Sequence, residues 1–533
     1  MRNMRRRIEI KEEKYSGSLL TLLQEMGEFL PAYCGGKGVC GKCKVRIRKK
    51  DGGQPEITET DRAFFTEEEL KDGWRLACCV TAEQGLLVEL AGESDEEEME
   101  IAVDFRLGVE AEAASLPADI EREESDTETV ASAMKQKEGT CPGGVAGDRG
   151  YVMVVDIGTT TIAASLVDPS AGHILKTVTG VNHQRRYGAD VVSRMQASNE
   201  GKGAELQRSI EEDLAGLAER LGVDYDRIPI IISGNTTMEH LLQNLSCRTL
   251  GKAPYDPVDI SLHDYKNMTI LPGISTFVGA DIVSGIIACG MDQSEEISLL
   301  IDLGTNGEMA IGNKDRILVT STAAGPAFEG GNICHGVAGI PGAISSVEIE
   351  DSKIPGGDAA VHVQTIGDKE AIGLCGTGVI EAVYEMLKQE WIDMTGRMEA
   401  PYDKEGFRLS GQIALYQKDV REIQLAKSAI CAGAETLISE YGIKPRKVDK
   451  VYLAGGFGQK INVDKALGIG LLPRIKPERI RAVGNSSLAG AILYATDPSV
   501  RARYLKVAAE STEIALATNK KFNNLYIERM LFE

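Results

Sequence analysis

Four cysteines near the start of the chain are spaced as metal ligands. They form the pattern Cys34-x5-Cys40-x2-Cys43, followed by Cys78 at the end of the segment RLAC. Thiolates are soft ligands that favour iron-sulfur clusters or zinc. Glycines crowd the first three cysteines (YCGGKGVCGKC), and they let a loop close around a metal centre with its amides pointing at the sulfurs. A zinc ribbon would need two Cys-x2-Cys pairs and this chain has one, so the pattern favours an iron-sulfur cluster.

A repeated turn indicates a second chemistry. Asp156-Ile-Gly158-Thr159-Thr160 recurs as Asp302-Leu-Gly304-Thr305-Asn306, and in each copy the turn joins two apolar segments that have the composition of strands. Such a turn presents backbone amides and hydroxyls to phosphate oxygens, and the Asp at the strand end can hold Mg²⁺ through water. Two such turns facing each other would clamp the phosphates of a nucleotide between two lobes.

A glycine-rich segment completes this set. Gly455-Gly456-Phe457-Gly458 follows the apolar segment 448–453, which is short enough for a strand. Glycines without side chains allow the backbone to approach a flat ring or a sugar closely. We therefore expect Gly455, Gly456, Phe457 and Gly458 to bind the adenosine part of ATP.

The elements around the cysteines resemble the α+β β-grasp fold of [2Fe-2S] ferredoxins. We expect strands at 44–47 and 76–90 and helices at 18–26 and 61–70. The first cysteine gap is one residue longer than in plant-type ferredoxins and resembles that of adrenodoxin-like ones. This resemblance implies a [2Fe-2S] cluster on Cys34, Cys40, Cys43 and Cys78. Cys79 could compete as the fourth ligand, but in a strand it should point to the opposite face from Cys78.

Charge divides the chain into domains. Its 533 residues carry a formal net charge of −21, and residues 93–128 alone hold fifteen Asp or Glu against Arg106 and Arg122. Such a segment repels itself and is expected to be a flexible linker. We predict a ferredoxin-like domain at 1–92, a linker at 93–149 and an ATPase domain at 150–533, with lobes of about 150–298 and 299–533. The linker is either a mechanical tether or only a solvated spacer.

Composition also argues against several classes of protein. The first residues lack the apolar core of a signal peptide, and no apolar run of about 18 residues occurs, so we expect no membrane segment. Eleven cysteines without an export signal suggest reduced thiols in a cytoplasmic protein. So acidic a chain is a poor partner for nucleic acid.

The two Asp-x-Gly-Thr turns and the later GGFG resemble the actin, Hsp70 and sugar-kinase superfamily of ATPases. That resemblance implies an α/β domain of two duplicated RNase H-like lobes closing over Mg-ATP. Four further segments resemble those of the reductive activators of corrinoid proteins, which join a [2Fe-2S] domain to this ATPase fold. They are 186–194 (RYGADVVSR), 233–238 (SGNTTM), 324–330 (AGPAFEG) and 375–378 (CGTG). The connector is short for the separate middle domain that some members carry.

The resemblance implies an ATP-dependent activator that passes single electrons from the cluster to an inactive Co(II) corrinoid, restoring Co(I). Asp156 and Asp302 would handle Mg²⁺ and the attacking water, residues 158–160 and 304–306 the phosphates. The implied partners are the corrinoid protein of a methyltransferase system, an upstream low-potential electron donor and a second copy of the chain, bound through the ATPase domain.

The corrinoid itself should belong to the partner. None of the six histidines has the Asp two positions earlier that a D-x-H-x-x-G cobalamin motif requires. The glycine-rich loop 321–342, with Cys334 and His335, is either a surface that meets the partner or a loop that packs beside the phosphates.

Two other functions remain open from the residues. A small-molecule kinase with a regulatory ferredoxin domain would need a general base, for which Asp281 in VGADIVS is a candidate. Phosphorylated product would then accumulate instead of free phosphate. An ATP-dependent electron-transfer activator of a non-corrinoid enzyme is the other, although the iron-sulfur ATPases of acyl-CoA reduction carry a different type of cluster.

Overall fold

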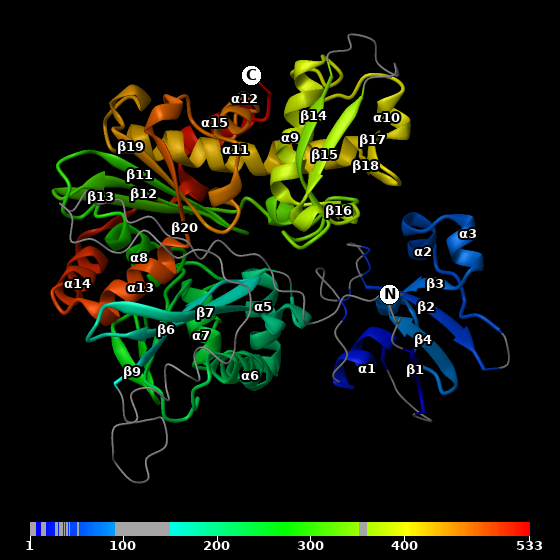
Figure 1. The fold of residues 1–533 in the computed structure, drawn as a ribbon, viewed down its shortest axis with the longest axis horizontal. Helices are drawn as coiled ribbons and strands as arrows, with labels where there is room; N and C mark the ends of the chain where they lie inside the picture. The colour runs from blue at the N-terminus through cyan, green and yellow to red at the C-terminus, as the bar shows by residue number, and fades with distance from the viewer. Residues whose placement is uncertain are drawn as a thin grey trace.

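A computed structural model describes two parts of the chain. It covers residues 7–11, 17–26, 30, 36, 38, 41, 43–50, 53–90, 150–188, 190–350 and 360–532. Cys34, Cys40 and the expected linker at 93–149 lie outside the described residues, so these remain predictions. Figure 1 shows the N-terminal part in blue and the larger part in colours from cyan to red.

The N-terminal part is an antiparallel four-stranded sheet with short helices. Its strands follow the order β1 (Arg7–Glu9), β4 (Leu86–Leu90), β2 (Lys44–Lys49) and β3 (Trp74–Leu76). Its helices are α1 (Leu19–Glu25), α2 (Glu59–Phe64) and α3 (Glu67–Lys71). Val45 and Ile47 of β2 share one core with Leu19 and Leu23 of α1. Val45 and Ile47 are two residues apart, so they point to the same face of the sheet, and α1 covers that face.

The single helix expected at 61–70 is wrong, because two helices occupy this segment. Phe65 is extended, with φ −132° and ψ 146°, and ends α2. Thr58 and Thr66 each begin a helix with a capping box, in which the threonine hydroxyl accepts from the third helical amide and that residue's carboxylate accepts from the threonine amide. A second cap eight residues after the first favours a new helix over continuation of the old one.

The continuous strand expected at 76–90 is also wrong. β3 ends at Leu76, a 3₁₀ turn spans Ala77–Cys79, and β4 begins at Leu86. The amide of Ala77 donates to the carbonyl of Cys43 at 2.8 Å, so the turn remains tied to the start of β2. This turn decides the orientation of the two adjacent cysteines, described below.

The larger part contains two six-stranded sheets of the same construction. The first has the order β7 (His173–Val181), β6 (Thr161–Asp168), β5 (Val152–Ile157), β8 (Ile230–Gly234), β10 (Met268–Ile270) and β9 (His263–Tyr265). The second has β20 (Ile480–Gly484), β19 (Lys450–Ala454), β11 (Ser298–Leu303), β12 (Gly307–Asn313), β13 (Arg316–Thr322) and β21 (Thr512–Glu513). In each, three antiparallel strands (β5 to β7, β11 to β13) are followed by a strand parallel to the first of them (β8, β19). We call the parts built on these sheets the first and second lobes.

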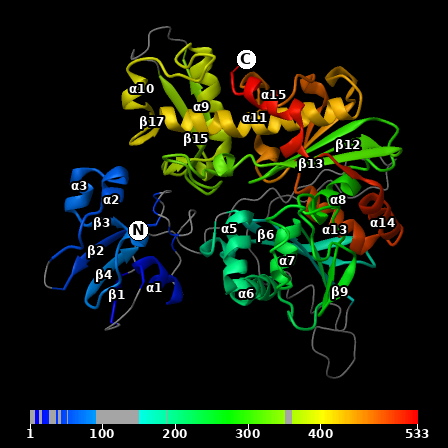
Figure 2. The same ribbon diagram turned by 180° about the vertical axis from the view of Figure 1, so that it is seen from behind.

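Helices cover both faces of each sheet. Between the sheets lie α8 (Ala280–Ala288), α13 (Ser486–Thr496) and α14 (Val500–Glu510), as Figures 1 and 2 both show. Their apolar side chains share one core with Val154 of β5 and Leu300 of β11. The outer face of the first sheet carries α6 (Gly203–Leu221), and that of the second carries α11 (Gln417–Glu440).

The remaining elements extend the lobes. They are α5 (Val191–Ala197), α7 (Thr236–Leu242), α9 (Gly376–Lys388), α10 (Tyr402–Glu405), α12 (Val463–Gly468), α15 (Lys520–Glu528), the sheet β15 (Val361–Thr365), β14 (Ala343–Ile349) and β16 (Gly373–Leu374), and the hairpin β17 (Phe407–Ser410) and β18 (Ile413–Leu415). Among the helices of the described ranges, none combines the length and apolar character needed to cross a bilayer.

Asp61 provides a test of how α2 is attached to the sheet. Its buried carboxylate accepts from the amide of Thr58 at 2.9 Å and from the amide of Leu76 at 2.9 Å. Asp61→Ala leaves two amides without these acceptors, so we expect the N-terminal domain to lose about 2–3 kcal/mol of unfolding free energy. Urea unfolding followed by the visible absorbance of the cluster measures this. Glu67→Ala, at an exposed position of α3, should cost less than about 0.5 kcal/mol, and equal losses in both variants would contradict the prediction.

Candidate functional site

Each Asp-x-Gly-Thr turn connects two adjacent antiparallel strands, β5 and β6 in the first sheet and β11 and β12 in the second. The turn after β5 is closed by the amide of Gly158, which donates to the carbonyl of Thr161 at 3.0 Å. In the second lobe the amide of Gly304 donates to the carbonyl of Asn306 at 3.2 Å. A Cβ atom on Gly158 would lie 2.6 Å from the Thr161 carbonyl oxygen, so the first turn requires glycine. The two turns therefore have the local form that the sequence predicts.

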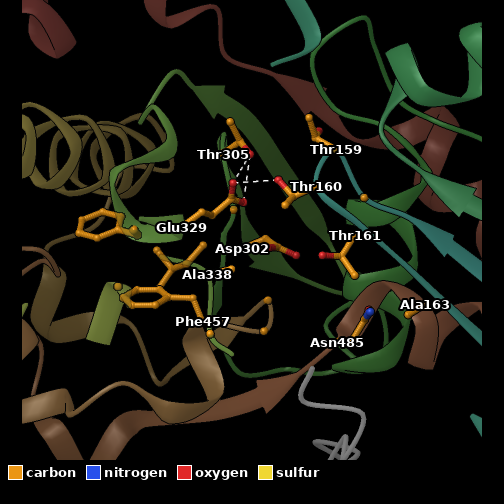
Figure 3. Close-up of a pocket in the computed structure, with 18 of the residues that line it drawn as sticks. Thr159, Thr160, Thr161, Ala163, Asp302, Thr305, Glu329, Ala338, Phe457 and Asn485 are labelled. Carbon is orange, nitrogen blue, oxygen red and sulfur yellow. Dashed lines mark hydrogen bonds between the residues drawn. The ribbon is translucent and has the colours of Figure 1, made fainter. Parts of the chain in front are cut away.

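A cavity of about 280 Å³ lies between the lobes and is lined by both turns. The sequence-predicted residues that line it are Asp156, Gly158, Thr159, Thr160, Asp302, Gly304, Thr305, Asn306, Gly455, Gly456 and Phe457. Gly458 is instead buried beneath the cavity wall, against Leu453. The fold thus brings together residues from three distant segments, which is the arrangement a nucleotide clamp requires (Figure 3). Nucleotide binding by these residues remains a prediction.

Asp156 is held in place by the start of α13. The side-chain amide of Asn485 donates to one carboxylate oxygen at 2.8 Å, and the hydroxyl of Ser487 donates to the other at 2.6 Å. Both residues line the cavity, and sequence reasoning missed them. One signal was available: Asn485 follows an apolar strand and precedes an apolar helix, and its side chain caps that helix by accepting from the amide of Leu488.

Further carboxylates surround Asp302. Asp281, Glu308 and Glu329 line the same cavity, and sequence reasoning had named only Asp281 among them. Burial, reinforced by the charge of Asp281, raises the pKa of Asp302 to about 8. Burial likewise raises the pKa of Asp281 to about 6 and that of Glu308 well above its ordinary value. Asp302 is partly exposed, but its exposed surface faces the cavity. Protein therefore surrounds the carboxylate, and burial is the main cause of its raised pKa.

This concentration of acidic groups favours a cation in the cavity. Like charges brought together in a poorly solvated site repel one another, and a bound cation relieves that repulsion. Within the described ranges, no three Asp, Glu, His or Cys side chains are arranged to ligate a metal ion directly. Mg²⁺ keeps several of its waters and often binds through one or two carboxylates together with phosphates. The donor set therefore fits Mg²⁺ held through water and nucleotide.

The GGFG segment forms the wall of the cavity beside Asp302. Gly455 has φ +87°, and a Cβ atom there would lie 2.8 Å from a carboxylate oxygen of Asp302. The ring of Phe457 stacks on that of Phe328, with centroids 5.3 Å apart and planes inclined by 13°. Both rings line the cavity and present apolar surface to it. A purine could pack against this wall, in agreement with the adenosine role predicted for Gly455, Gly456 and Phe457.

The glycine-rich loop 321–342 packs within the second lobe. The amide of Cys334 donates to Asp419 at 2.8 Å, and the ring of His335 is hydrogen-bonded to the backbone of Ala414. Burial raises the pKa of the Cys334 thiol to about 12, which keeps it protonated. Ala338 and Gly339 line the cavity. Of the two roles left open by the sequence, these contacts favour a loop that packs beside the cavity.

Two of the predicted cluster ligands are described, and their sulfur atoms meet. Cys43 precedes β2 and Cys78 lies in the 3₁₀ turn after β3, with 3.3 Å between the sulfurs. Nearby, Gly41 has φ +64°, and a Cβ atom there would lie 2.3 Å from the ring of Phe64, so the loop requires glycine at this point. Two converging thiols beside a glycine-dependent loop fit a [2Fe-2S] cluster.

The expectation that Cys79 points away from Cys78 is wrong. Their sulfur atoms lie 3.8 Å apart, because both residues belong to a 3₁₀ turn and the alternation of a strand does not apply. Cys79 also approaches the cysteine loop, since a Cβ atom on Gly38 would lie 3.3 Å from its sulfur. The sulfur of Cys43 contacts that of Cys78, which favours Cys78 as the fourth ligand.

Single substitutions test this assignment. Cys78→Ser should abolish the visible absorbance and the reduced-state paramagnetic signal of a [2Fe-2S] cluster, because a hydroxyl replaces a thiolate ligand. Cys79→Ser should retain both and leave two irons per chain. Loss of the cluster in the Cys79 variant alone would assign the ligand to Cys79 instead.

The raised pKa of Asp302 predicts a pH-dependent stability. The folded carboxyl keeps its proton up to about pH 8, whereas the unfolded one loses it near pH 4, so this group lowers stability as pH rises between these values. Without nucleotide or divalent cation, Asp302→Asn should therefore raise Tm by about 2–4 °C at pH 8 and by less at pH 5. Calorimetry of both proteins at the two pH values measures this difference. The exposed Asp315→Asn is the matched control, and a gain for Asp302→Asn that does not grow with pH would contradict the prediction.

Three family models match successive parts of the chain. A family model described as the 2Fe-2S iron-sulfur cluster binding domain matches residues 4–83. One described as the RACo middle region matches 151–294, and one described as the C-terminal domain of RACo, the ASKHA domain, matches 296–533. The residues called the middle region are thus those of the first lobe.

Similar proteins cover most of the chain. The corrinoid activation enzyme RamQ of Eubacterium limosum is 32% identical over 425 residues, which cover 72% of this chain and 70% of that protein. The [Co(II) methylated amine-specific corrinoid protein] reductase of Methanosarcina barkeri is 29% identical, covering 71% of this chain and 76% of that protein. A solved structure titled reductive activator for corrinoid, iron-sulfur protein matches with a TM-score of 0.65 and 27% identity, covering 98% of this chain and 96% of that one.

These matches confirm the predicted fold class, a ferredoxin-like N-terminal domain joined to an actin- and Hsp70-like ATPase domain. They also confirm the family resemblance stated from the sequence. The chain belongs to the family of reductive activators of corrinoid proteins.

Proposed function

We propose that the protein uses ATP to pass single electrons from a [2Fe-2S] cluster to the inactive Co(II) corrinoid of a partner methyltransferase system, restoring Co(I). One observation carries this proposal: a cluster-binding fold and a cavity between the two lobes of an ASKHA domain occur in one chain whose relatives are named for corrinoid activation. The partner in this proposal is a protein that carries the corrinoid.

The energetics explain why such a protein would need ATP. Plant-type [2Fe-2S] clusters have potentials near about −400 mV, and the family resemblance implies a lower cobalt couple. Each 59 mV of one-electron mismatch opposes transfer by a factor of about ten. ATP can offset such a gap in potential only if it binds one conformation of the complex between activator and corrinoid protein more tightly than the other. The cavity between two lobes is suited to this, because closing the lobes on a nucleotide changes the shape of the whole domain.

The cavity residues divide the work on the nucleotide. Residues 158–160 and 304–306 would contact the phosphates with amides and hydroxyls, and Gly455, Gly456 and Phe457 would contact the adenosine. Asp156, fixed by Asn485 and Ser487, would hold the water shell of Mg²⁺. Asp302 would orient the attacking water, and the positive charge of bound Mg²⁺ would keep it ionised at neutral pH.

The N-terminal domain would supply the redox chemistry. Cys34, Cys40, Cys43 and Cys78 would hold the cluster, which when bound supplies a one-electron carrier. An upstream low-potential electron donor would reduce the cluster. Two copies of the chain would associate through their ATPase domains. Cys43 belongs to the buried core that joins α1 to the sheet, and Cys78 packs against it, so this core would hold the two sulfur atoms in position for the cluster.

Anaerobic reactivation tests the function directly. The purified holoprotein, a low-potential reductant and Mg-ATP are mixed with a Co(II) corrinoid protein, and Co(I) is followed by its absorbance. Asp302→Asn should lower the ATP-dependent rate at least about 100-fold, because a water-orienting carboxylate is lost, while the cluster's absorbance remains. Unchanged reactivation in this variant would overturn the role of Asp302.

Two controls separate the alternatives. Asp315→Asn, an exposed substitution of the same kind in the second lobe, should leave the reactivation rate unchanged. Release of free phosphate supports an ATPase, whereas a phosphorylated small molecule would support the kinase with Asp281 as its base. ATP hydrolysis with no cobalt reduction for any corrinoid protein would favour an activator of a non-corrinoid enzyme.

A further inference from the structure

Glu329 joins the two phosphate turns directly. Its carboxylate accepts from the hydroxyl of Thr160 at 2.9 Å and from the hydroxyl of Thr305 at 2.9 and 3.0 Å. Thr160 belongs to the first lobe and Thr305 to the second, so one side chain bridges the lobes at the middle of the cavity. Figure 3 shows the carboxylate between the two threonines, with the three contacts as dashed lines.

The same hydroxyls are needed by a nucleotide. A threonine hydroxyl has one proton to donate, so while it donates to Glu329 it cannot donate to a phosphate oxygen. A carboxylate at this position would also repel the negative charge of the phosphates across a poorly solvated cavity. Glu329 and the phosphates therefore compete for one place between the turns.

Arg194 supports the bridged arrangement from the first lobe. This buried guanidinium donates to the carbonyls of Thr159 at 2.6 Å and Gly188 at 2.9 Å, and its positive charge lowers the pKa of Glu329 against the opposing effect of burial. Burial has the larger effect and leaves the pKa of Glu329 above its ordinary value. Arg194 thus contacts the backbone of the first turn and, together with the hydrogen bonds from Thr305 and Thr160, opposes the effect of burial on Glu329.

The segment that carries Glu329 is a short helix between two glycines. It is the 3₁₀ helix Pro326–Glu329, flanked by Gly325 with φ 77° and Gly330 with φ 78°. These left-handed angles favour glycine and mark points where the backbone direction changes. Phe328 on the same helix stacks on Phe457, so movement of Glu329 would also move the wall expected to meet the purine.

We propose that Glu329 is a latch that holds Thr160 and Thr305 together and must be released before the phosphates of a nucleotide can take their hydroxyls. This inference rests on the proposed function, because it places the nucleotide in this cavity. Release of the latch would also shift Phe328, the preceding residue of the same helix, so a site with phosphates bound would have a different purine wall from a latched one.

Binding kinetics of Mg²⁺ and N-methylanthraniloyl-ATP test the latch by stopped-flow fluorescence. In the wild-type holoprotein the observed rate should level off at high nucleotide concentration, because release precedes binding. Glu329→Gln keeps one acceptor oxygen for the two hydroxyls but removes the charge that repels the phosphates, so it should bind nucleotide at least about 10-fold more tightly and reach a higher plateau rate. Glu329→Asp keeps the charge but is one methylene too short to reach both threonines, so it should remove the plateau.

Glu308→Gln is the matched control. Glu308 is a buried carboxyl group of the same cavity that is hydrogen-bonded to Asp281, and burial raises its pKa well above the ordinary value. Its substitution therefore changes an acidic group of the cavity without touching the latch. The wild-type plateau should persist in this variant. Equal tightening in the Glu308 and Glu329 variants, or a plateau unchanged by Glu329→Gln and Glu329→Asp, would overturn the latch. No binding by any of these proteins would instead refute the nucleotide site itself.

Discussion

The close packing of α8 against α13 between the two sheets is the constraint on which the rest of the larger domain depends. Nearly every residue of both helices is buried, so each must be covered on more than one side. A Cβ atom on Gly490 would lie 2.1 Å from the carbonyl of Ser284, and one on Gly285 would lie 2.8 Å from Leu300. Glycine at these positions lets the helices and the second sheet approach closely enough for the two turns to face one cavity.

The same packing explains the unusual electrostatics of the site. Burying α8 and α13 carries Asp281, Asn485 and Ser487 to the cavity, where β5 and β11 already deliver Asp156 and Asp302. Hydroxyls of Ser233, Ser284 and Ser487 form a buried chain with contacts of 2.9 Å that ends on Asp156. Polar groups in a core are stable only when they have hydrogen-bond partners. The carboxylates that face the cavity remain able to interact with a ligand. Function here costs stability, as is common where like charges are held together.

In the N-terminal domain, packing and hydrogen bonds likewise determine which side chains meet. Two capping boxes break one expected helix into α2 and α3, and Asp61 ties the first of them to the residue where β3 ends. The chain then enters a 3₁₀ turn, which brings Cys78 to Cys43 and leaves Cys79 close by. A single strand through this segment would have separated the two adjacent thiols by the alternation of its side chains.

The sequence by itself determined the parts whose chemistry is local. The local structure of three motifs was predictable, because it depends on neighbouring residues and on glycine conformations. These motifs are the cysteine loop, the two Asp-x-Gly-Thr turns and the GGFG segment. The sequence could not show that Glu329 bridges Thr160 and Thr305, or that Asn485 and Ser487 hold Asp156, because these partners are far apart in the chain and only packing unites them. The orientation of Cys79 was wrong for a related reason: a 3₁₀ turn, stabilised by the contact of Ala77 with Cys43, replaced the strand. Tertiary structure decided which polar groups meet, since burial forces each of them to find its partner wherever the fold places it.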